Sequence, residues 1–408
     1  MQRIERANIP CNLCGGTDVT VLSNKSRSGA PLRTVACVGC GLVWSDPRPH
    51  DPRRFYEDEY RVAYKGCFSP KAKHVLRAGR VALARLRAIE PLLRPGLRAL
   101  DVGSGGGEFA YLLKTRGLSV VGVEPNRGYA GYAAREHGLQ IERGFIDEVT
   151  LAPQSFDLIT LWHVLEHTAD PGGVLARLRS VLRADGVLVV EVPNVEATCQ
   201  SPRSTFHEAH LYNFNEATLR RLGEKAGLRA ESITLSPDGG NLTAVFRAQA
   251  ECVSGSALRL PGNHARVAAA VRSHTPIRHW LRVHPYRRTF DRLYRAVEER
   301  LALLSAPRGR ALLDRLYSAP DPARVRPALW PAIASLFAFA LFFEEVFVDR
   351  VLPAYGWTEA EALVPYFGAQ AAALVGATWM AFRRGYAAQR LAILLAAALP
   401  VFALPSYC

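Results

Sequence analysis

The feature that most constrains the fold is an alternation of short β-rich runs and helical segments between residues 97 and 192. Strands that alternate with helices predict a parallel sheet with helical crossovers, because parallel strands need a long connection back to the same edge. We therefore expect an α/β domain with a mostly parallel sheet. The expected strands are Arg98–Val102, Ser119–Glu124, Phe156–Leu161 and Val187–Val192, and the expected helices are Glu108–Arg116, Arg127–His137 and Gly173–Leu182.

A glycine-rich turn follows the first expected strand. It reads Asp101-Val-Gly103-Ser-Gly105-Gly-Gly107-Glu and opens a helix, so bare backbone can approach a ligand closely. A plain tight turn would explain the glycines alone, but Asp101 would repel a pyrophosphate and attract an ammonium group. Glu124 ends the second strand, where a carboxylate can accept hydrogen bonds from both hydroxyls of a ribose. These residues favour a nucleoside with a cationic aminoacyl group over a dinucleotide.

Two closely spaced pairs of cysteines lie near the N-terminus. Two residues separate Cys11 from Cys14, two separate Cys37 from Cys40, and the pairs are about 22 residues apart. This spacing predicts a tetrahedral zinc site in a zinc ribbon. Four thiolates leave no open coordination position, so we expect the Zn²⁺ to be structural rather than catalytic.

The net charge of +14 is concentrated behind the α/β region. Between residues 252 and 326 there are fifteen arginines and five acidic residues, and mostly apolar sequence follows. A basic block beside apolar sequence favours an anionic lipid surface as partner over nucleic acid. The N-terminus lacks the apolar core of a secretion signal, so we expect the front of the chain in the cytoplasm.

Three apolar segments near the C-terminus predict membrane helices. Ala362–Phe382 is long enough to span a bilayer, whereas Ala328–Phe343 and Leu391–Pro405 are shorter. The loop after the second segment is rich in arginine and the loop before it is acidic, which places the α/β domain on the cytoplasmic face. We therefore expect about three spans in a multi-pass membrane protein, with a helical bundle or a dimerisation domain as the alternative.

Four stretches of the chain resemble the successive motifs of class I S-adenosylmethionine (SAM)-dependent methyltransferases. They are Ala99–Gly107, Val120–Glu124, Ser155–His167 and Ala184–Asn194. The resemblance covers residues 97–248 and implies a Rossmann-like domain with SAM as co-substrate. The front of the chain is similar to a bacterial subfamily in which two Cys-x2-Cys pairs and a tyrosine-rich stretch, here at residues 55–60, precede this domain.

The resemblance implies a role for each matching residue. The acid and glycines of the turn would hold the methionyl part of SAM, Glu124 the ribose, and Phe145 and Ile146 the adenine. The family often has an acid where this chain has Phe145, so Asp147 or the backbone would meet the adenine amino group. The full expected set is Asp101, Gly103, Ser104, Gly105, Gly107, Glu124, Phe145, Ile146 and Trp162.

The segment around His163, Glu166 and His167 carries the first candidate catalytic groups. His-x-x-Glu-His is also a zinc peptidase pattern, but here it follows a strand instead of lying within a long helix, so we reject that reading. Ubiquinone-pathway O-methyltransferases carry a similar stretch, in which an acid, a glutamate and a histidine are associated with a divalent metal. This chain has His163, and not an acid, at the position where an acid would help to bind that divalent metal. The plainer alternative is that Glu166 and His167 orient the loop and cap a helix.

His210 lies where the subfamily usually shows a His-Leu-x-x-Phe stretch. In O-methylation the acceptor hydroxyl loses its proton, and an imidazole with a pKa near 6.5 suits that task. His210 is therefore our first candidate base and His163 the second. Each could instead only hydrogen-bond a loop, because proximity carries much of a methyl transfer.

The sequence thus predicts a membrane-anchored SAM-dependent methyltransferase that acts on an oxygen of a membrane-linked glycan or a lipophilic acceptor. A quinone-type small-molecule O-methyltransferase and a non-catalytic SAM-binding membrane adaptor are the alternatives. The predicted regions are a zinc ribbon in 1–60, a helical connector in 61–96, the methyltransferase domain in 97–250, a basic helical linker in 251–326 and transmembrane helices in 327–408.

Overall fold

The computed structural model describes residues 9–47, 69–282 and 309–318, together with 285, 295–296, 299–300 and 302–303. The chain divides into two units, one made of Met1–Asp291 with Ala306–Tyr317 and the other of Arg292–Ser305 with Ser318–Cys408. Both sheets and the candidate site lie in the first unit. The tyrosine-rich stretch at residues 55–60 lies outside the described ranges.

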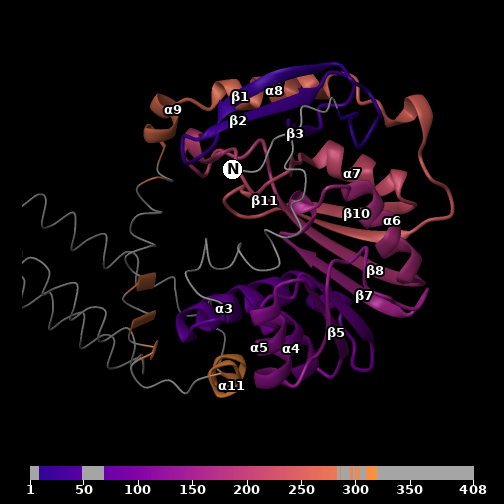
Figure 1. Cartoon of the computed structure of the whole chain (residues 1–408), viewed down its shortest axis with the longest axis vertical. Coiled ribbons are helices and arrows are strands. Elements are labelled where there is room, and N and C mark those ends of the chain that lie inside the picture. The colour runs from indigo at the N-terminus through magenta and orange to yellow at the C-terminus, as the bar shows by residue number, and fades with distance from the viewer. Residues whose placement is uncertain are drawn as a thin grey trace, which may run out of the picture. The chain divides into compact units, whose positions relative to one another are not determined.

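A seven-stranded sheet forms the centre of the first unit. Its strands from β8 to β6 are parallel, and β11 pairs antiparallel with both β8 and β10, which confirms the expected mostly parallel α/β fold. Across the sheet the order is β10 (Leu228–Leu235), β11 (Asn241–Ala248), β8 (Leu182–Pro193), β7 (Phe156–Trp162), β4 (Arg98–Val102), β5 (Ser119–Glu124) and β6 (Gln140–Arg143) (Figure 1).

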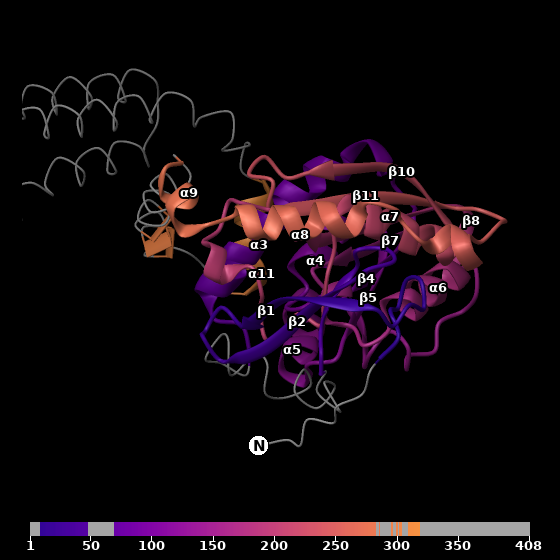
Figure 2. The same ribbon diagram turned by 90° about the horizontal axis from the view of Figure 1, so that it is seen from above.

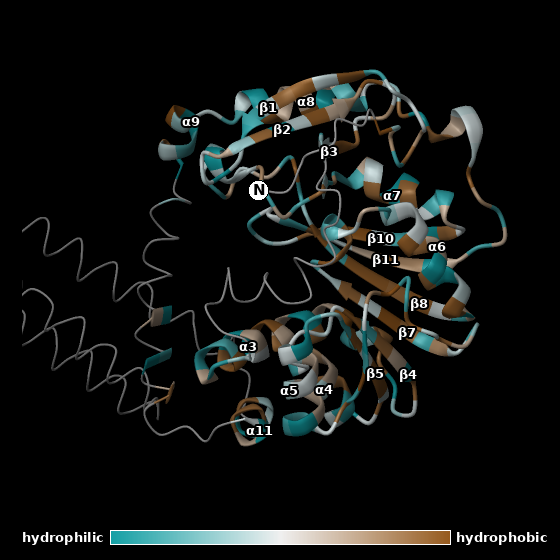
Figure 3. Ribbon diagram, in the orientation of Figure 1, coloured by the Kyte–Doolittle hydropathy of each residue, from teal (hydrophilic) through white to brown (hydrophobic). Residues whose placement is uncertain are grey.

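Helices cover the sheet on both faces, and strand side chains alternate between two apolar cores. In β4, Leu100 and Val102 belong to the core that includes residues of α6 and α7, whereas Ala99 belongs to the core with α3 and α4. The apolar strands and the more polar helices are visible in Figure 3. The helices are α3 (Ala72–Ile89), α4 (Glu108–Thr115), α5 (Arg127–His137), α6 (Pro171–Val181) and α7 (Glu216–Lys225).

Local sequence signals set where the helices after the candidate catalytic segments begin. Asp170 caps α6 by accepting a hydrogen bond from the Gly173 amide, and Pro171 occupies the first helical position. Asn215 and Thr218 form a reciprocal capping box at the start of α7. The segments before these helices therefore have fixed ends.

The N-terminal cysteine region forms part of a second, four-stranded antiparallel sheet. Its strands are β1 (Val19–Lys25), β2 (Pro31–Cys37), β3 (Val43–Ser45) and β9 (Tyr212–Asn213). The last of these is distant in sequence from the other three. Trp44 of β3 is buried in the same core as the large sheet. Helix α8 (Asn263–Ser273) packs on β2 of this sheet. In the large sheet, both views show β10 beside β11 (Figures 1 and 2). The short helices are η2 (Glu90–Leu92), η3 (Leu165–His167), η4 (Pro202–Ser204), η5 (Gly255–Leu258), α9 (Pro276–Trp280) and α11 (Arg310–Ser318).

The expected multi-pass membrane location is corrected by the structure. In the described part of the chain no helix is long and apolar enough to cross a membrane. The described α-helices after residue 250, α8, α9 and α11, have eleven, five and nine residues, and the 3₁₀ helix η5 has four, whereas a spanning helix needs about 20 apolar residues. The apolar segments on which the prediction was based, in residues 327–408, lie outside the described residues.

Candidate active site

A cavity of about 1250 Å³ lies at the carboxyl ends of the parallel strands. Sites for one small ligand usually enclose roughly 300–1,000 Å³, so this cavity has room for a nucleoside and a second molecule. We call it the central cavity. Every residue that we expected to contact SAM lines it except Gly107, and all four candidate catalytic residues line it.

The glycine-rich turn joins β4 to α4 in a conformation that side chains would disturb. Gly103 has φ +71°, and a Cβ there would lie 2.3 Å from a methyl carbon of Val164. Gly107 has φ +83°, and its Cβ would lie 2.7 Å from a methyl carbon of Leu139. Both positions therefore require glycine. The turn presents bare backbone to the central cavity, as the sequence suggested.

Two buried acids flank this turn. Asp101 accepts a hydrogen bond from the hydroxyl of Thr160 at 2.8 Å, and burial raises the pKa of its carboxyl to about 7 against the effect of that bond. Glu124 accepts one hydrogen bond from the amide of Gly105 at 2.7 Å and another from the amide of Asn126 at 3.1 Å. The carboxylate of Glu124 is thus fixed between the turn and the start of α5.

Apolar side chains line the central cavity near these acids. Ile146 is buried, and the amide of Phe145 donates to the carboxylate of Glu148 at 3.3 Å. Trp162 is buried edge-to-face against Phe109, with 5.2 Å between ring centroids. Flat apolar walls of this kind suit a purine ring.

His163 follows β7 in a strained backbone conformation, with φ +54°. Its Nδ1 lies 3.1 Å from Glu166 and its Nε2 lies 3.2 Å from Glu191. Burial alone would lower the pKa of this imidazole, but the hydrogen bonds with the two carboxylates raise it to about 9. His163 is therefore an imidazolium at neutral pH. Arg85 also pairs with Glu191, at 3.0 Å, and its guanidinium lies over the Trp162 ring.

Three further histidines gather beside Glu166. The ring of His210 lies edge-on to His167 at 4.9 Å and stacks on His207 at 4.8 Å between centroids. His167 Nδ1 lies 2.7 Å from the carbonyl oxygen of Ala209, which joins the loop after β7 to the segment before β9. The ligand atoms of Glu166, His167 and His210 all lie within 4.8 Å of one another.

Burial sets the protonation of this cluster. It lowers the pKa of His210 to about 3, although the charge of Glu166 opposes the shift, and it lowers the pKa of His207 to about 4. Both imidazoles are therefore neutral at neutral pH. Burial alone would raise the pKa of Glu166, but the hydrogen bond with His163 and neighbouring imidazoles bring it to about 2. Oε2 of Glu166 is buried and has no hydrogen-bond partner among the described residues.

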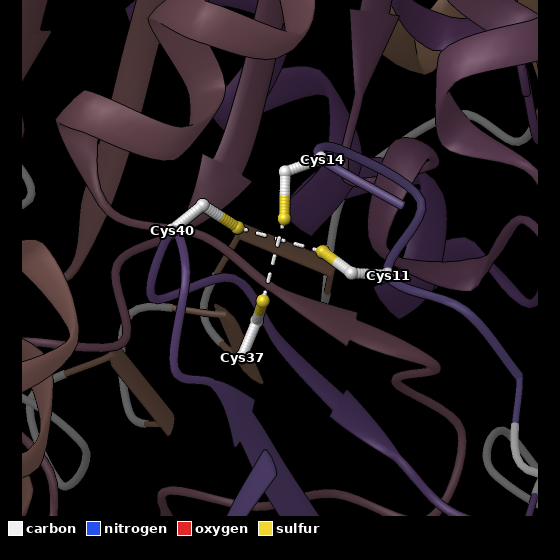
Figure 4. Close-up of side chains that lie close together, drawn as sticks. All are labelled: Cys11, Cys14, Cys37 and Cys40. Atoms are coloured by element: carbon white, nitrogen blue, oxygen red, sulfur yellow. Dashed lines mark hydrogen bonds between the residues drawn. The ribbon is translucent and has the colours of Figure 1, made fainter. Parts of the chain in front are cut away.

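The four N-terminal cysteines converge at one point (Figure 4). The sulfurs of Cys11 and Cys40 are 3.4 Å apart, as are those of Cys14 and Cys37. These separations exceed the roughly 2.05 Å of a disulfide but suit four sulfurs around one Zn²⁺. A Cβ at Gly16 would contact the Cys14 sulfur at 3.4 Å, so the cluster sits in a close backbone cradle. The residues fit a structural zinc ion with four thiolate ligands.

Sequence reasoning missed three members of the site. Arg85 comes from α3, whose register on the sheet no motif predicts. Glu191 could have been noticed from the sequence, because it is the one charged residue in the otherwise apolar expected strand Val187–Val192. His207 lies three residues before His210 in the same segment, and only the fold shows that their rings stack.

Residues 73–233 match the family model described as a methyltransferase domain. The chain therefore contains a SAM-dependent methyltransferase domain, the class that its fold and central cavity define. Among curated proteins it is similar to the ubiquinone biosynthesis O-methyltransferase of Azorhizobium caulinodans, with 34% identity over 113 residues, 26% of this chain and 44% of that protein. The protein of the same name from Aeromonas salmonicida is 28% identical over 152 residues, 33% of this chain and 63% of that protein.

The chain thus spans about half the length of the curated relatives that it matches. Among solved structures, a SAM-dependent methyltransferase from Mesorhizobium loti is 18% identical with a TM-score of 0.36, over 40% of this chain and 97% of that one. The 1,6-didemethyltoxoflavin-N1-methyltransferase of Burkholderia thailandensis is 21% identical with a TM-score of 0.37, over 52% of this chain and 98% of that one.

Proposed function

We propose that this chain transfers a methyl group from SAM to a hydroxyl oxygen of a small molecule in the central cavity. One observation carries the proposal: the same cavity is lined by Asp101 and Glu124, beside the glycine-rich turn, and by His167 and His210, from the segments after β7 and before β9. We call these two parts of its lining the acid-lined end and the histidine-lined end. When bound, SAM supplies a methyl group on a positively charged sulfur. A cavity that holds donor and acceptor together makes their reaction effectively intramolecular.

The acid-lined end would bind the nucleoside. The carboxylate of Glu124, already fixed by two amides, would accept hydrogen bonds from the ribose hydroxyls. Asp101 would face the ammonium group of the methionyl part. Because burial raises the pKa of Asp101 to about 7, a cation placed beside it would favour its ionised form. Phe145 and Ile146 would flank the adenine.

The histidine-lined end would bind the acceptor, and His210 would take its proton. The imidazole of His210 is neutral, because burial lowers its pKa to about 3. The imidazolium formed by proton transfer would lie beside the carboxylate of Glu166, which would stabilise the new charge. His163 would serve differently: it is already protonated, and it neutralises the buried Glu166.

The weak basicity of His210 favours a phenolic acceptor. A phenol has a pKa near 10 and loses its proton far more readily than an aliphatic alcohol. The curated relatives named above are O-methyltransferases of ubiquinone biosynthesis, which agrees with transfer to an oxygen atom. The hydroxyl of a sugar or glycan is the other candidate acceptor.

A second chemistry uses a divalent cation at the same end of the cavity. Glu166, His167 and His210 present ligand atoms within 4.8 Å of one another, and Oε2 of Glu166 is buried without a hydrogen-bond partner in the described part of the chain. One carboxylate and two imidazoles suit such an ion, which would lower the pKa of a bound hydroxyl. His210 would then be a ligand and not a base.

One experiment separates these outcomes. The full chain is incubated with methyl-labelled SAM and either a simple catechol or a hexose, with and without a chelator and added Zn²⁺, an ion that suits imidazole and carboxylate ligands. We expect label in the catechol and, at low SAM concentration, much less label when Glu124 is replaced by alanine. Dependence on Zn²⁺ would favour the cation, and label only in the hexose would overturn the phenolic acceptor. Binding of SAM without label in any acceptor would favour a non-catalytic SAM-binding protein.

A further inference from the structure

The N-terminal cysteine region makes polar contacts with both segments that carry the candidate catalytic histidines. We call residues 9–47 the cysteine module. Asn12, which lies between Cys11 and Cys14, donates to the carboxylate of Asp170 at 2.7 Å and accepts from the amide of Gly172 at 2.9 Å. Asp170 is the N-cap of α6, three residues after His167. The side chain of Asn12 is therefore bonded directly to the end of the loop that carries Glu166 and His167.

The other contact reaches the segment of His210. Ser45 of β3 donates from its amide to the carbonyl of Leu211 at 3.0 Å and from its hydroxyl to the carbonyl of His210 at 3.1 Å. Strand β9, which follows at once, pairs with β3 through Val43 and Trp44. The buried Ser45 thus holds two consecutive peptide groups, one on each side of the Leu211 Cα.

These two segments are too short to hold their own geometry. The segment with Glu166 and His167 is a single 3₁₀ turn of three residues, and β9 has two residues. They bond to each other through the Leu211 amide and the Glu166 carbonyl at 2.8 Å. A strand of two residues is stable only when a neighbour supplies the pairing, and here β3 of the cysteine module does so.

The SAM-binding end has a different support. The glycine turn follows β4, and Glu124 ends β5. Strand β4 pairs with β5 and β7, and β5 also pairs with β6, all within the large sheet. The glycine-rich turn and Glu124 are therefore held by pairing within the large sheet, whereas the segment of His210 also depends on β3 of the cysteine module.

We infer that the cysteine module positions the acceptor end of the central cavity, with Asn12 and Ser45 as its positioning residues. This inference rests on the proposed function only in that the histidine end is taken as the acceptor end. Loss of the Asn12 side-chain contacts and of the bond from the Ser45 hydroxyl to His210 displaces His210 from Glu166 and leaves the nucleoside end intact, while the backbone bond from Ser45 to Leu211 remains.

The test compares Asn12→Ala combined with Ser45→Ala against Asn24→Ala combined with Ser23→Ala in the full chain. Asn24 is exposed on β1, and the hydroxyl of Ser23 bonds to Lys25 in the same strand, so the second pair changes the same residue types away from the site. Three quantities are measured: kcat with a catechol, the dissociation constant of SAM, and amide hydrogen exchange in residues 207–213 and 98–107.

The positioning role predicts that only the first pair of substitutions lowers kcat, by about tenfold or more, since displacements of about 1 Å can cost that much. The SAM dissociation constant stays within about twofold, and exchange becomes faster in residues 207–213 but not in 98–107. Unchanged exchange in 207–213, or an equal loss of SAM affinity and turnover, would overturn the inference. If the double substitution fails to fold, Asn12→Ala alone, read by the same exchange, decides it.

Hydrogen exchange also keeps this inference distinct from the proposed function. If the wild-type chain methylates no acceptor, the proposed function fails while the exchange pattern can still be read. Cys14→Ser combined with Cys37→Ser disturbs the cysteine cluster without changing Glu166, His167 or His210. Faster exchange in residues 207–213 than in 98–107 supports the inference, and equal acceleration in both contradicts it.

Discussion

Nδ1 of His163 lies 3.1 Å from Oε1 of Glu166, so a protonated imidazole faces a carboxylate that is 1% exposed. A buried carboxylate without a cation is strongly destabilising, whereas a paired one is tolerated. His163 adopts a positive φ to reach this position. The strain at His163 is therefore offset by an ion pair that lets Glu166 stay charged beside His210.

Replacement of His163 by glutamine removes the charge that compensates Glu166. We expect the free energy of unfolding at pH 7 to fall by about 2 kcal/mol, less than for a fully buried pair because His163 is partly exposed. Denaturant titration measures the change. Glu166→Gln combined with His163→Gln removes both charges and should recover part of the loss. A double variant no more stable than His163→Gln would contradict the ion-pair account.

Replacement of His210 by alanine tests the proposed base. General base catalysis contributes typically 10²–10⁴-fold, so kcat with a catechol should fall by about 10²-fold or more. The dissociation constant of SAM should change by less than about twofold, because the proposed function assigns SAM binding to Asp101, Glu124 and the glycine-rich turn and not to His210. His264→Ala is the control, since His264 lies on α8 and bonds Thr20. Equal turnover in both variants would remove His210 from the mechanism.

His137 gives the stability a pH dependence that is independent of the central cavity. It is 1% exposed, stacks on Tyr111, and neither ring nitrogen has a hydrogen-bond partner among the described residues. Burial lowers the pKa of His137 to about 4, below the unfolded value of 6.5. The unfolded chain therefore binds more protons between these values, so stability is lost as pH falls from 6.5 towards 4.

The expected loss from His137 is about 3 kcal/mol over that range, from 1.36 kcal/mol for each pKa unit. Denaturant titrations between pH 4 and 7 would measure it. His137→Phe keeps an aromatic ring against Tyr111 and removes the titrating group, so its curve should be flatter. A wild-type curve that runs parallel to that of His137→Phe would show that His137 is not responsible.

The sequence predicted four strands of the large sheet, β4, β5, β7 and β8, because their signals are local. These strands and the three expected helices appear close to their predicted bounds, except that β8 begins five residues earlier, since apolar runs, glycine turns and caps act over a few neighbours. Strands β6, β10 and β11 of the same sheet were not predicted, and the short β9 was missed. A two-residue strand has no periodicity, and β9 exists because β3 lies beside it.

The candidate site was predicted as a set of residues but not as a network. The acid-led turn, Glu124 and the histidine segments lie on one cavity, as motifs on strand ends suggest. The protonation of the histidines depends on partners far away in the sequence. His163 was a candidate base by residue type, yet its contact with Glu191 keeps it protonated, and no spacing rule shows that contact. The role of His163 as a base stays a prediction, and its protonated state disfavours that role because a protonated imidazole cannot accept a proton.

The most direct test of the account is isothermal titration of the full chain with SAM and with its demethylated product. We predict binding of both at one site, and Glu124→Ala should weaken it by about 30-fold, since two hydrogen bonds to a charged group contribute roughly 2 kcal/mol or more. Circular dichroism establishes that each variant is folded. A folded wild-type chain that gives neither heat nor a thermal shift with either nucleoside would contradict the central claim.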